Sequence, residues 1–319
     1  MKTVYKDVLL ALCMGLILPS AFLNAAMALI PPREEPPAVT EATTMPTESE
    51  DTIKLLHNDG TVTEENMEDY LVSALIGEMP ADFELEALKA QAVAARTYTK
   101  KVISSGFKHG EGTICENPAC CQARLSPAEY VSRGGIPGDL EKIRRAVSET
   151  SGQVLTYQGE LIEAVYFSCS GGITEDAVAV WGADIPYLRS VESPGEENAP
   201  YDTDTVEFTP QSFQDLLGQN LEGTPDTWFG ETTYTSGGGV AKMVIGGLAY
   251  TGTALRSQLG LRSTAFTVET TPEKITIHTR GWGHRVGMSQ YGADAMAVQG
   301  ATYDEILSHY YPGTILEQS

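Results

Sequence analysis

The sequence predicts an α+β fold, in which a single membrane-spanning segment precedes a mixed α/β domain with an inserted subdomain. Three observations support this prediction. An apolar stretch comes first, a region with helical periodicity follows at Tyr70–Thr99, and short strand-like runs separated by glycine-rich turns make up much of the rest. A chain of 319 residues is also long enough to bury a sizeable core.

The first element is the apolar segment Val8–Ile30, which follows Lys2 and Lys6. Its 23 residues can cross a bilayer, and the lysines place the short N-terminal side in the cytoplasm. The alternative is a cleaved signal peptide, because Ala26-Met27-Ala28 resembles a cleavage site. Length favours an anchor, assigned to residues 1–30. In either case the remaining chain is expected outside the cytoplasm.

Residues 31–51 are rich in proline, glutamate and threonine, which predicts a flexible, self-repelling tether. The globular domain is assigned to residues 52–316, with an inserted subdomain at 194–266. The net charge of −22 argues against nucleic acid and anionic lipid as partners for most of the surface. It does not exclude a local basic cleft.

The region Tyr70–Thr99 predicts two helices joined by a sharp bend. Gly77 is expected to end the first helix in a left-handed conformation, and Pro80 prevents that helix from resuming. Asp82 is expected to cap the second helix, which presents a stripe of small residues. Glu78 then belongs to neither helix. It is either a solvated surface carboxylate or a fixed general acid.

A glycine-broken loop follows the second helix and carries four soft or borderline metal ligands, namely His109, Cys115, Cys120 and Cys121. Four such ligands with no open position describe a closed tetrahedral zinc site, which is structural rather than catalytic. The alternative is a disulfide between two of the cysteines, as expected in an oxidising compartment. Zinc is favoured, with a role in fixing the bend.

The middle of the chain predicts further short elements. Leu140–Ser148 has the pattern of an amphipathic helix, and Gly152–Tyr157 with Leu161–Ser168 predicts a hairpin that turns at Gln158-Gly159. Inside the subdomain, Phe213–Leu217 predicts a short helix.

Cys169 lies where a predicted strand runs into a small-residue turn, so it could act as a nucleophile with His284 as its base. No third group that would orient the histidine is identifiable, and this thiol-hydrolase hypothesis is disfavoured.

The last block contains the run GWGHRVGMSQYGADAMA. A strand at Ile275–His278 precedes a glycine-bracketed turn at Gly281–His284, and Ser289 is expected to cap the next helix. His284, Ser289 and Gln290 therefore gather near one helix N-terminus, where they could hold a ligand oxygen.

Separated blocks between about residues 52 and 315 resemble the stage II sporulation protein D and amidase-enhancer family. The blocks are GEMP…LEALKAQAVAARTY, VYFSCSGGITE, AVWGADIPYLRSVE, YTGTALRSQLGLRSTAF and GWGHRVGMSQYGADAMA. This chain departs from the usual family pattern at three places: Phe83-Glu84 replaces Trp-Pro, Cys169 replaces serine and Arg285 replaces glycine.

The resemblance implies that Glu78 is the catalytic residue of a lytic transglycosylase. It also implies that Arg96, Tyr187 and Arg189 face the cleft, with His284 shaping it. Arginines there would suit a sugar that carries a carboxylate, as N-acetylmuramic acid does through its lactyl group. Some members of the family carry zinc on a similar loop.

The resemblance further implies cleavage of peptidoglycan glycan strands, with 1,6-anhydro ends, during septal wall degradation in engulfment. The expected partners are a sporulation wall amidase and a multipass membrane anchor protein. The expected location is the mother-cell membrane facing the forespore, as a single-pass protein with its domain outside the cytoplasm. The main alternative is a non-catalytic wall-binding module that activates an amidase. A zinc hydrolase is a weaker alternative, because it needs an open metal position that four protein ligands do not leave.

Overall fold

The structure is a computed structural model that describes residues 52–106, 108–110, 112–197, 199–200 and 202–319. The predicted anchor, cleavage site and tether lie outside these residues. Within them, none of the helices combines the length and apolar character needed to span a bilayer. The described chain mixes α-helices with several small sheets, as the sequence predicts.

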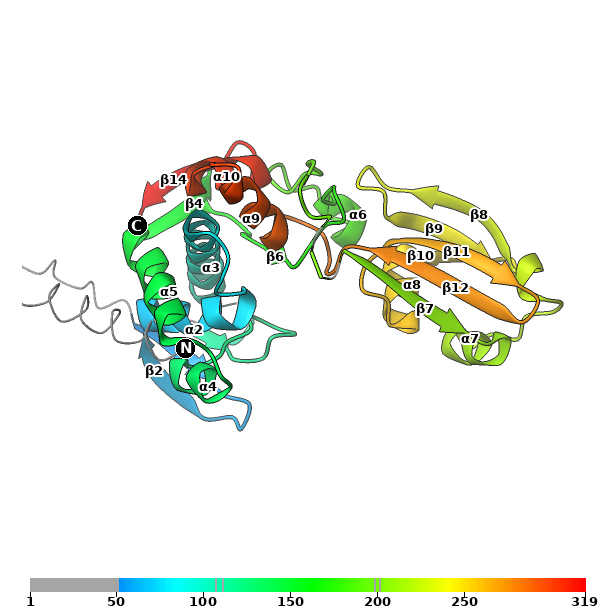
Figure 1. The fold of residues 1–319 in the computed structure, drawn as a ribbon, viewed down its shortest axis with the longest axis horizontal. Helices are drawn as coiled ribbons and strands as arrows, with labels where there is room; N and C mark the ends of the chain where they lie inside the picture. Colours follow the sequence, from blue (N-terminus) through cyan, green and yellow to red (C-terminus); the bar gives the residue numbers. More distant parts are fainter. Residues whose placement is uncertain (1–51, 107, 111, 198, 201) are drawn as a thin grey trace, which may run out of the picture. The chain divides into compact units, whose positions relative to one another are not determined.

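The main core is organised around α3 (Leu85–Ser105), in which five of the thirteen buried residues are alanine. Small side chains let neighbouring elements approach closely. The partners of α3 are α2 (Met67–Glu78), α5 (Pro137–Glu149), α9 (Gln290–Val298), α10 (Tyr303–Tyr310) and β4 (Gln153–Tyr157). In Figure 1 the late helices α9 and α10, drawn in red, accordingly lie beside the early helix α3.

Two small sheets flank this core. In one, β4 pairs antiparallel with β14 (Ile315–Gln318) and with β5 (Glu160–Leu161). The predicted hairpin turn is present, since Gln158 and Gly159 adopt φ values of 54° and 81°. In the other sheet, β1 (Thr52–Leu56) lies between β2 (Val62–Asn66) and β3 (Thr113–Cys115).

A second hydrophobic core lies within residues 203–280 and is built on two three-stranded sheets. One sheet contains β7 (Thr203–Phe208), β12 (Lys274–Arg280) and β11 (Ala265–Thr271), and the other contains β8 (Phe229–Tyr234), β9 (Val240–Ile245) and β10 (Leu248–Thr251). The helices α7 (Pro210–Leu217) and α8 (Gly252–Leu259), with the 3₁₀ turn η2 (Pro225–Thr227), complete it. This core includes β12 and therefore continues beyond residue 266.

The bend between α2 and α3 differs from its predicted form. Gly77 does not adopt a left-handed conformation, and α2 continues through Glu78 to an extended Met79. A Cβ on Gly77 would lie 2.6 Å from the Cα of Arg124, so glycine is required there by close approach of another segment. Asp82 does not cap α3; the N-cap is Glu84, whose backbone N–H donates to Asp294.

Shorter elements connect these parts: α4 (Pro127–Ser132), α6 (Ala177–Trp181), β6 (Tyr166–Phe167) and β13 (Met288–Ser289). The strands β6 and β13 pair in parallel, with Met288 opposite Tyr166 and Ser289 opposite Phe167. Because β13 directly follows residues 281–287, this pairing places that turn next to β6. Gly287 allows that contact, because a Cβ there would lie 2.1 Å from the carbonyl oxygen of Val165.

Candidate active site

A cavity of about 600 Å³ lies next to the carboxyl group of Glu78. Four segments that are distant in sequence form its wall: the end of α2, residues 118–121, residues 165–168 and residues 282–284, with Tyr98 from α3. Among the described lining residues, Glu78 is the only carboxylate. The site can therefore perform acid–base chemistry with a single carboxyl group.

Glu78 is the last residue of α2, and its carboxyl group is held by a backbone donor. The N–H of Ala123 donates to Oε1 of Glu78 over 2.6 Å. This contact fixes the carboxyl group at the cavity wall, whereas most of the rest of α2 is buried in the core. The short distance is typical of a hydrogen bond to a charged acceptor.

The segment 122–125 is fixed in turn by α2 and α3, which explains how Ala123 is positioned. The backbone N–H of Leu125 donates to the carbonyl of Ser73 over 2.9 Å. The side chain of Gln122 donates to Thr99 over 2.7 Å and accepts from the hydroxyl of Tyr166 over 2.8 Å. The absence of a side chain on Gly77 lets this segment lie directly on α2.

Burial raises the pKa of Glu78 above the usual value for a glutamate, while the Ala123 hydrogen bond and the side chain of Gln290 oppose that shift. Gln290 is 5 % exposed, and its buried Nε2 has no hydrogen bond of standard geometry among the described residues. The amide of Gln290 therefore lowers the pKa of Glu78 as a nearby donor, without a hydrogen bond of standard geometry. A raised pKa increases the fraction of Glu78 that is protonated at a given pH, as a general acid requires.

His284 lines the same cavity, but its surroundings favour the neutral ring. It packs against Phe167 and Trp181, with ring centroids 5.7 Å and 5.3 Å away. The backbone N–H of Val286 donates to its Nδ1 over 3.1 Å, which requires that nitrogen to be unprotonated. Burial lowers the pKa of His284 to about 4, and the charge of Arg256 adds to this effect. His284 is therefore a neutral wall residue.

Ser289 and Gln290 occupy different surroundings although they are adjacent in sequence. Ser289 is the N-cap of α9, and its hydroxyl donates to Glu196 over 2.5 Å. It is fully buried and does not line the cavity. Of the two, Gln290 is the one that influences Glu78.

Sequence reasoning did not single out Glu196, a buried carboxylate that organises the rear of the site. Its two oxygens accept from the backbone and hydroxyl of Ser170, from the N–H of Gly171, and from the hydroxyls of Ser193 and Ser289. These contacts join the end of β6 to the start of α9. The sequence gives no signal for this role, because Glu196 lies in a stretch that is acidic throughout.

The resemblance implied that Arg96, Tyr187 and Arg189 face the cavity. In the structure none of the three lines it. Arg96 is completely buried and forms a two-pronged ion pair with Glu68, at 2.9 and 2.7 Å. Its remaining donors reach backbone carbonyls. None of these partners lines the cavity beside Glu78, and the Glu68 side chain is itself 34 % exposed, so in this structure Arg96 makes structural contacts.

Tyr187 and Arg189 make local contacts instead of lining the cavity. The hydroxyl of Tyr187 accepts from the backbone N–H of Glu163 over 3.1 Å. Arg189 forms an ion pair with Asp184 over 2.6 Å, at an exposed position. Neither residue is among those that line the cavity beside Glu78.

Cys169 does not have the environment of a nucleophile. It is fully buried, and its backbone pairs with that of Trp282. Burial raises the pKa of its thiol to about 12, so the thiolate needed for attack is not formed at neutral pH. This agrees with the preference against a thiol hydrolase.

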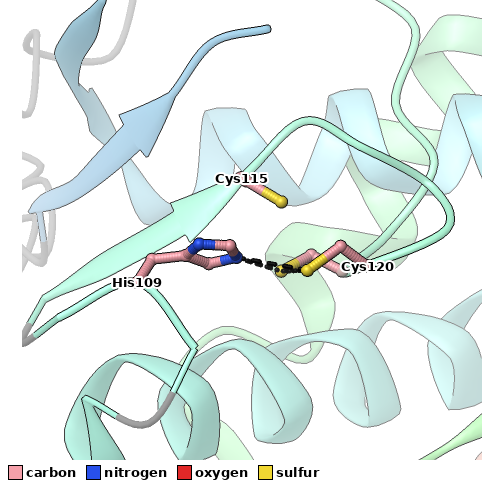
Figure 2. A group of neighbouring side chains, drawn as sticks. His109, Cys115 and Cys120 are labelled. Carbon is pink, nitrogen blue, oxygen red and sulfur yellow. Dashed lines mark hydrogen bonds between the residues drawn. The ribbon is translucent and has the colours of Figure 1, made fainter. Parts of the chain in front are cut away.

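His109, Cys115, Cys120 and Cys121 come together as a possible metal-binding group (Figure 2). Their ligand atoms all lie within 4.8 Å of one another. The three cysteines are free thiols, and the sulfur atoms of Cys120 and Cys121 are 4.0 Å apart, about twice the length of a disulfide bond. The disulfide alternative is therefore not realised in this structure.

The distances from His109 to two of the cysteines are close to those between ligands of one tetrahedral ion. Zinc bonds of about 2.3 Å to sulfur and about 2.0 Å to nitrogen place tetrahedral ligands roughly 3.6–3.8 Å apart. Nε2 of His109 lies 3.3 Å from the sulfur of Cys120 and 3.5 Å from that of Cys121. One nitrogen and three sulfur ligands suit a soft or borderline ion. The group brings together the two ends of the loop that precedes Ala123.

Fold and site together define an α+β protein with one carboxyl group on a cavity wall, beside a possible metal-binding group of one histidine and three cysteines. Comparison with known sequences gives the family. The chain belongs to the stage II sporulation protein D family, because it is 41% identical to the Bacillus subtilis protein of that name over 79% of this chain and 75% of that protein. The family is one of sporulation proteins.

Further comparisons agree with this assignment. The family model described as "Stage II sporulation protein" matches residues 57–157, which include Glu78 and the metal-ligand group. Stage II sporulation protein D of Bacillus amyloliquefaciens is 40% identical over 79% of this chain and 74% of that protein. An amidase enhancer of Bacillus subtilis is 31% identical over 77% of this chain and 40% of that protein.

Proposed function

We propose that this protein is a lytic transglycosylase that cleaves the glycan strand of peptidoglycan between N-acetylmuramic acid and N-acetylglucosamine. The observation that carries the proposal is the lone carboxyl group of Glu78 on the cavity wall, with a pKa raised by burial. Hydrolytic glycosidases ordinarily need two carboxyl groups flanking the bond. A transglycosylase needs one, because the substrate supplies its own nucleophile.

In this mechanism Glu78 acts first as an acid and then as a base. The protonated carboxyl group donates its proton to the bridging oxygen, the C1–O bond breaks, and positive charge develops at C1. The C6 hydroxyl of the same muramic residue then attacks C1, and the Glu78 carboxylate accepts the hydroxyl proton. A 1,6-anhydro ring and a free hydroxyl on the leaving sugar result, and no water is consumed. The N–H of Ala123 stabilises the intervening carboxylate.

Product analysis of purified glycan strands tests this proposal. The parent protein should release ends that are lighter by one water than hydrolytic ends, and Glu78→Gln should abolish them. Glutamine keeps the oxygen that accepts from Ala123 but cannot cycle a proton. Glu84→Gln is the matched control, since this exposed residue lies in the same bend and does not line the cavity. Retained release of anhydro ends by Glu78→Gln would remove Glu78 from the mechanism.

A second candidate function is activation of a peptidoglycan amidase without glycan cleavage. The similarity to an amidase enhancer favours it. This function predicts that Glu78→Gln stimulates a wall amidase as well as the parent does. Loss of stimulation together with loss of anhydro ends would argue that the glycan chemistry is primary.

For the group of His109, Cys115, Cys120 and Cys121 we propose structural zinc. The four ligands leave no open position for a substrate, so a bound ion here would hold the loop rather than take part in turnover. The loop continues directly into Ala123, the hydrogen-bond donor to Glu78. Metal analysis of purified protein, with one zinc per chain expected, tests the identity of the ion.

The proposed setting is the wall between mother cell and forespore during engulfment, with the N-terminal segment as a membrane anchor. Proposed partners are a wall amidase, which supplies glycan strands freed of peptide, and a multipass membrane protein. Fractionation of sporulating cells tests the anchor: the full-length chain should stay with membranes in high salt, whereas a chain cleaved after Ala28 should not.

A further inference from the structure

A glycan strand is longer than the Glu78 cavity can hold. The cavity of about 600 Å³ has the size of a small-molecule site, so it accommodates only the sugars next to the bond that is cut. The rest of a bound strand must leave the cavity and pass over its wall. Side chains just outside the wall can therefore contact sugars that are remote from Glu78.

Trp181, the last residue of α6, adjoins the wall from outside. Its ring centroid lies 5.3 Å from that of His284, which lines the cavity. Trp181 itself is not among the described residues that line the cavity, and it is 46 % exposed. Tryptophan is largely buried on average, so packing against His284 accounts for only part of this ring.

Backbone contacts hold Trp181 in place beside His284. Glu175, just before α6, forms a β-bridge with Val286, just after His284. At the other end of α6, the N–H of Gly182 donates to a carbonyl one turn back over 3.0 Å. The exposed ring is thus presented by a backbone that is attached to the His284 turn, so little ordering is required when a ligand binds.

The exposed surface of α6 suits a narrow ligand. Val178, one turn before Trp181, is also 46 % exposed. Two apolar side chains fall far short of the roughly 20–30 residues that each partner contributes to a protein–protein interface. A single flat aromatic ring matches the C–H face of one pyranose instead, while the hydroxyl groups at the edge of the sugar remain in water.

We propose that Trp181 is a glycan-binding residue outside the Glu78 cavity, where its ring stacks on a sugar of the strand that has passed the wall at His284. The inference rests on the proposed function for the identity of the strand. Stacking on a pyranose face involves neither the lactyl group nor its charge. The contact therefore holds long strands more tightly than short ones and leaves the reaction at Glu78 unchanged.

Binding of strands of increasing length tests the proposal, with the full-length protein carrying Glu78→Gln so that no strand is cut. The probes are peptide-free oligosaccharides of alternating N-acetylglucosamine and N-acetylmuramic acid, from a disaccharide to a dodecasaccharide. Affinity should rise with length until the strand covers Trp181. Trp181→Ala should weaken binding of the dodecasaccharide by about tenfold, the scale of one aromatic contact, and binding of the disaccharide by less than about twofold.

The disaccharide is the internal control for folding, because a disturbed wall at His284 would weaken binding at every length. Trp181→Phe keeps an aromatic face next to His284 and should recover most of the affinity for the dodecasaccharide. Tyr234→Ala is the matched control, since Tyr234 is an aromatic residue with 56 % exposure that lines a different cavity. It should leave binding unchanged at every length.

The proposal is overturned if affinity does not rise with length, if no strand binds, or if Trp181→Ala weakens short and long strands alike. Product analysis with protein that retains Glu78 separates this result from the fate of the proposed activity. Length-dependent binding through Trp181, without release of anhydro ends, would support the binding residue and contradict the transglycosylase. Release of anhydro ends from long strands at low concentration, at a rate that Trp181→Ala does not change, would support the transglycosylase and contradict the binding residue.

Discussion

The carboxyl group of Glu78 combines two properties that are usually opposed. Burial destabilises its charged form, whereas the N–H of Ala123 stabilises that form. The balance leaves its pKa raised, so the group can lend a proton and still carry the resulting charge. The nearby amide of Gln290 lowers the pKa of Glu78, so substituting Gln290 should change that pKa while Glu78 stays in place.

Activity should depend on pH through this group. The first step of the proposed mechanism needs protonated Glu78, so turnover should fall as the pH rises through its raised pKa. Gln290→Leu removes a group that lowers this pKa and should move the alkaline limb of the turnover profile to higher pH. The measurement is the initial rate of anhydro-end release across pH. An unchanged limb would show that the Gln290 amide does not act on Glu78.

Gly77→Ala should disturb the site while leaving most of the fold intact. The added methyl group would lie 2.6–2.8 Å from the backbone of Ala123 and Arg124, so the segment that bonds Glu78 must move. We expect a loss of about 1–3 kcal/mol in the free energy of unfolding, with a larger loss of activity.

The matched control for this substitution is Gly138→Ala. Gly138 lies in α5 with open space around its Cα, and alanine there should leave stability equal or raise it by about 0.5–1 kcal/mol. Denaturant unfolding of both variants makes the comparison. Equal stability for the two would contradict the close-approach explanation for Gly77.

Features of single residues could be predicted where neighbouring sequence determines them. They could not be predicted where contacts between distant segments determine them. The two helices and the bend between them were predicted, because helical periodicity and Pro80 are local signals, but Glu78 was expected outside both helices and instead ends α2. The ion pair of Arg96 with Glu68 was not, since nothing in the sequence indicates which way an arginine on a helix points. Glu196 was missed for the same reason: its five hydrogen-bond donors come from three separate segments.

Among the elements, the loop 109–124 connects the metal-ligand group to Glu78. The ligands at Cys120 and Cys121 are followed directly by Gln122, which bonds Thr99, and by Ala123. An ion held by the loop would therefore fix the Ala123 N–H that donates to Glu78. The ion itself would take no part in the reaction. We therefore expect the proposed activity to depend on the proposed metal through geometry alone.

Removing the metal should loosen this loop and not simply stop turnover. We expect a chelator, or Cys115→Ser, to lower the melting temperature and to increase amide exchange at Ala123. Cys169→Ala is the control, since this buried cysteine lies outside the group and its loss should leave the metal content unchanged. Unchanged exchange at Ala123 after metal removal would contradict the structural role.

Elements with strong periodicity were predicted close to their observed ends. Leu140–Ser148 became α5 at Pro137–Glu149, and Ser289 caps α9 as expected. The pairing of β6 with β13 was beyond sequence reasoning, because two residues on each strand carry no pattern. That pairing is imposed by Gly287 and by the contacts of Glu196, both of which are tertiary.

Across the whole molecule, the buried pair of Arg285 and Glu175 joins the main core to the inserted subdomain. The guanidinium lies 3.3 Å from the carboxylate and also donates to the carbonyl of Gly237, while Glu175 accepts from Thr235 and Gly239. Arg285 adopts a φ of 65°, in the left-handed region that favours glycine. Arg285 therefore adopts a strained backbone conformation and, through its side chain, connects the main core to the subdomain.

Arg285→Gly should destabilise the protein even though glycine suits the backbone. The substitution leaves Glu175 buried without its partner, for which we expect a loss of about 3–5 kcal/mol in the free energy of unfolding. Adding Glu175→Gln should recover part of this loss, because the neutral amide costs less to bury. The melting temperatures of the single and double variants provide the measurement. A double variant less stable than Arg285→Gly would contradict this account.

The partners of α3 have a consequence for the order in which the protein is made. Helix α3 is covered by α9 and α10, and β4 is completed by β14, so the first half of the core waits for the segments after residue 289 to be synthesised. Gln290 and the His284 turn arrive with that same final stretch. A polypeptide interrupted before residue 281 would thus hold Glu78 without the later part of the cavity wall, so any chemistry at this carboxyl group would have to wait for that stretch.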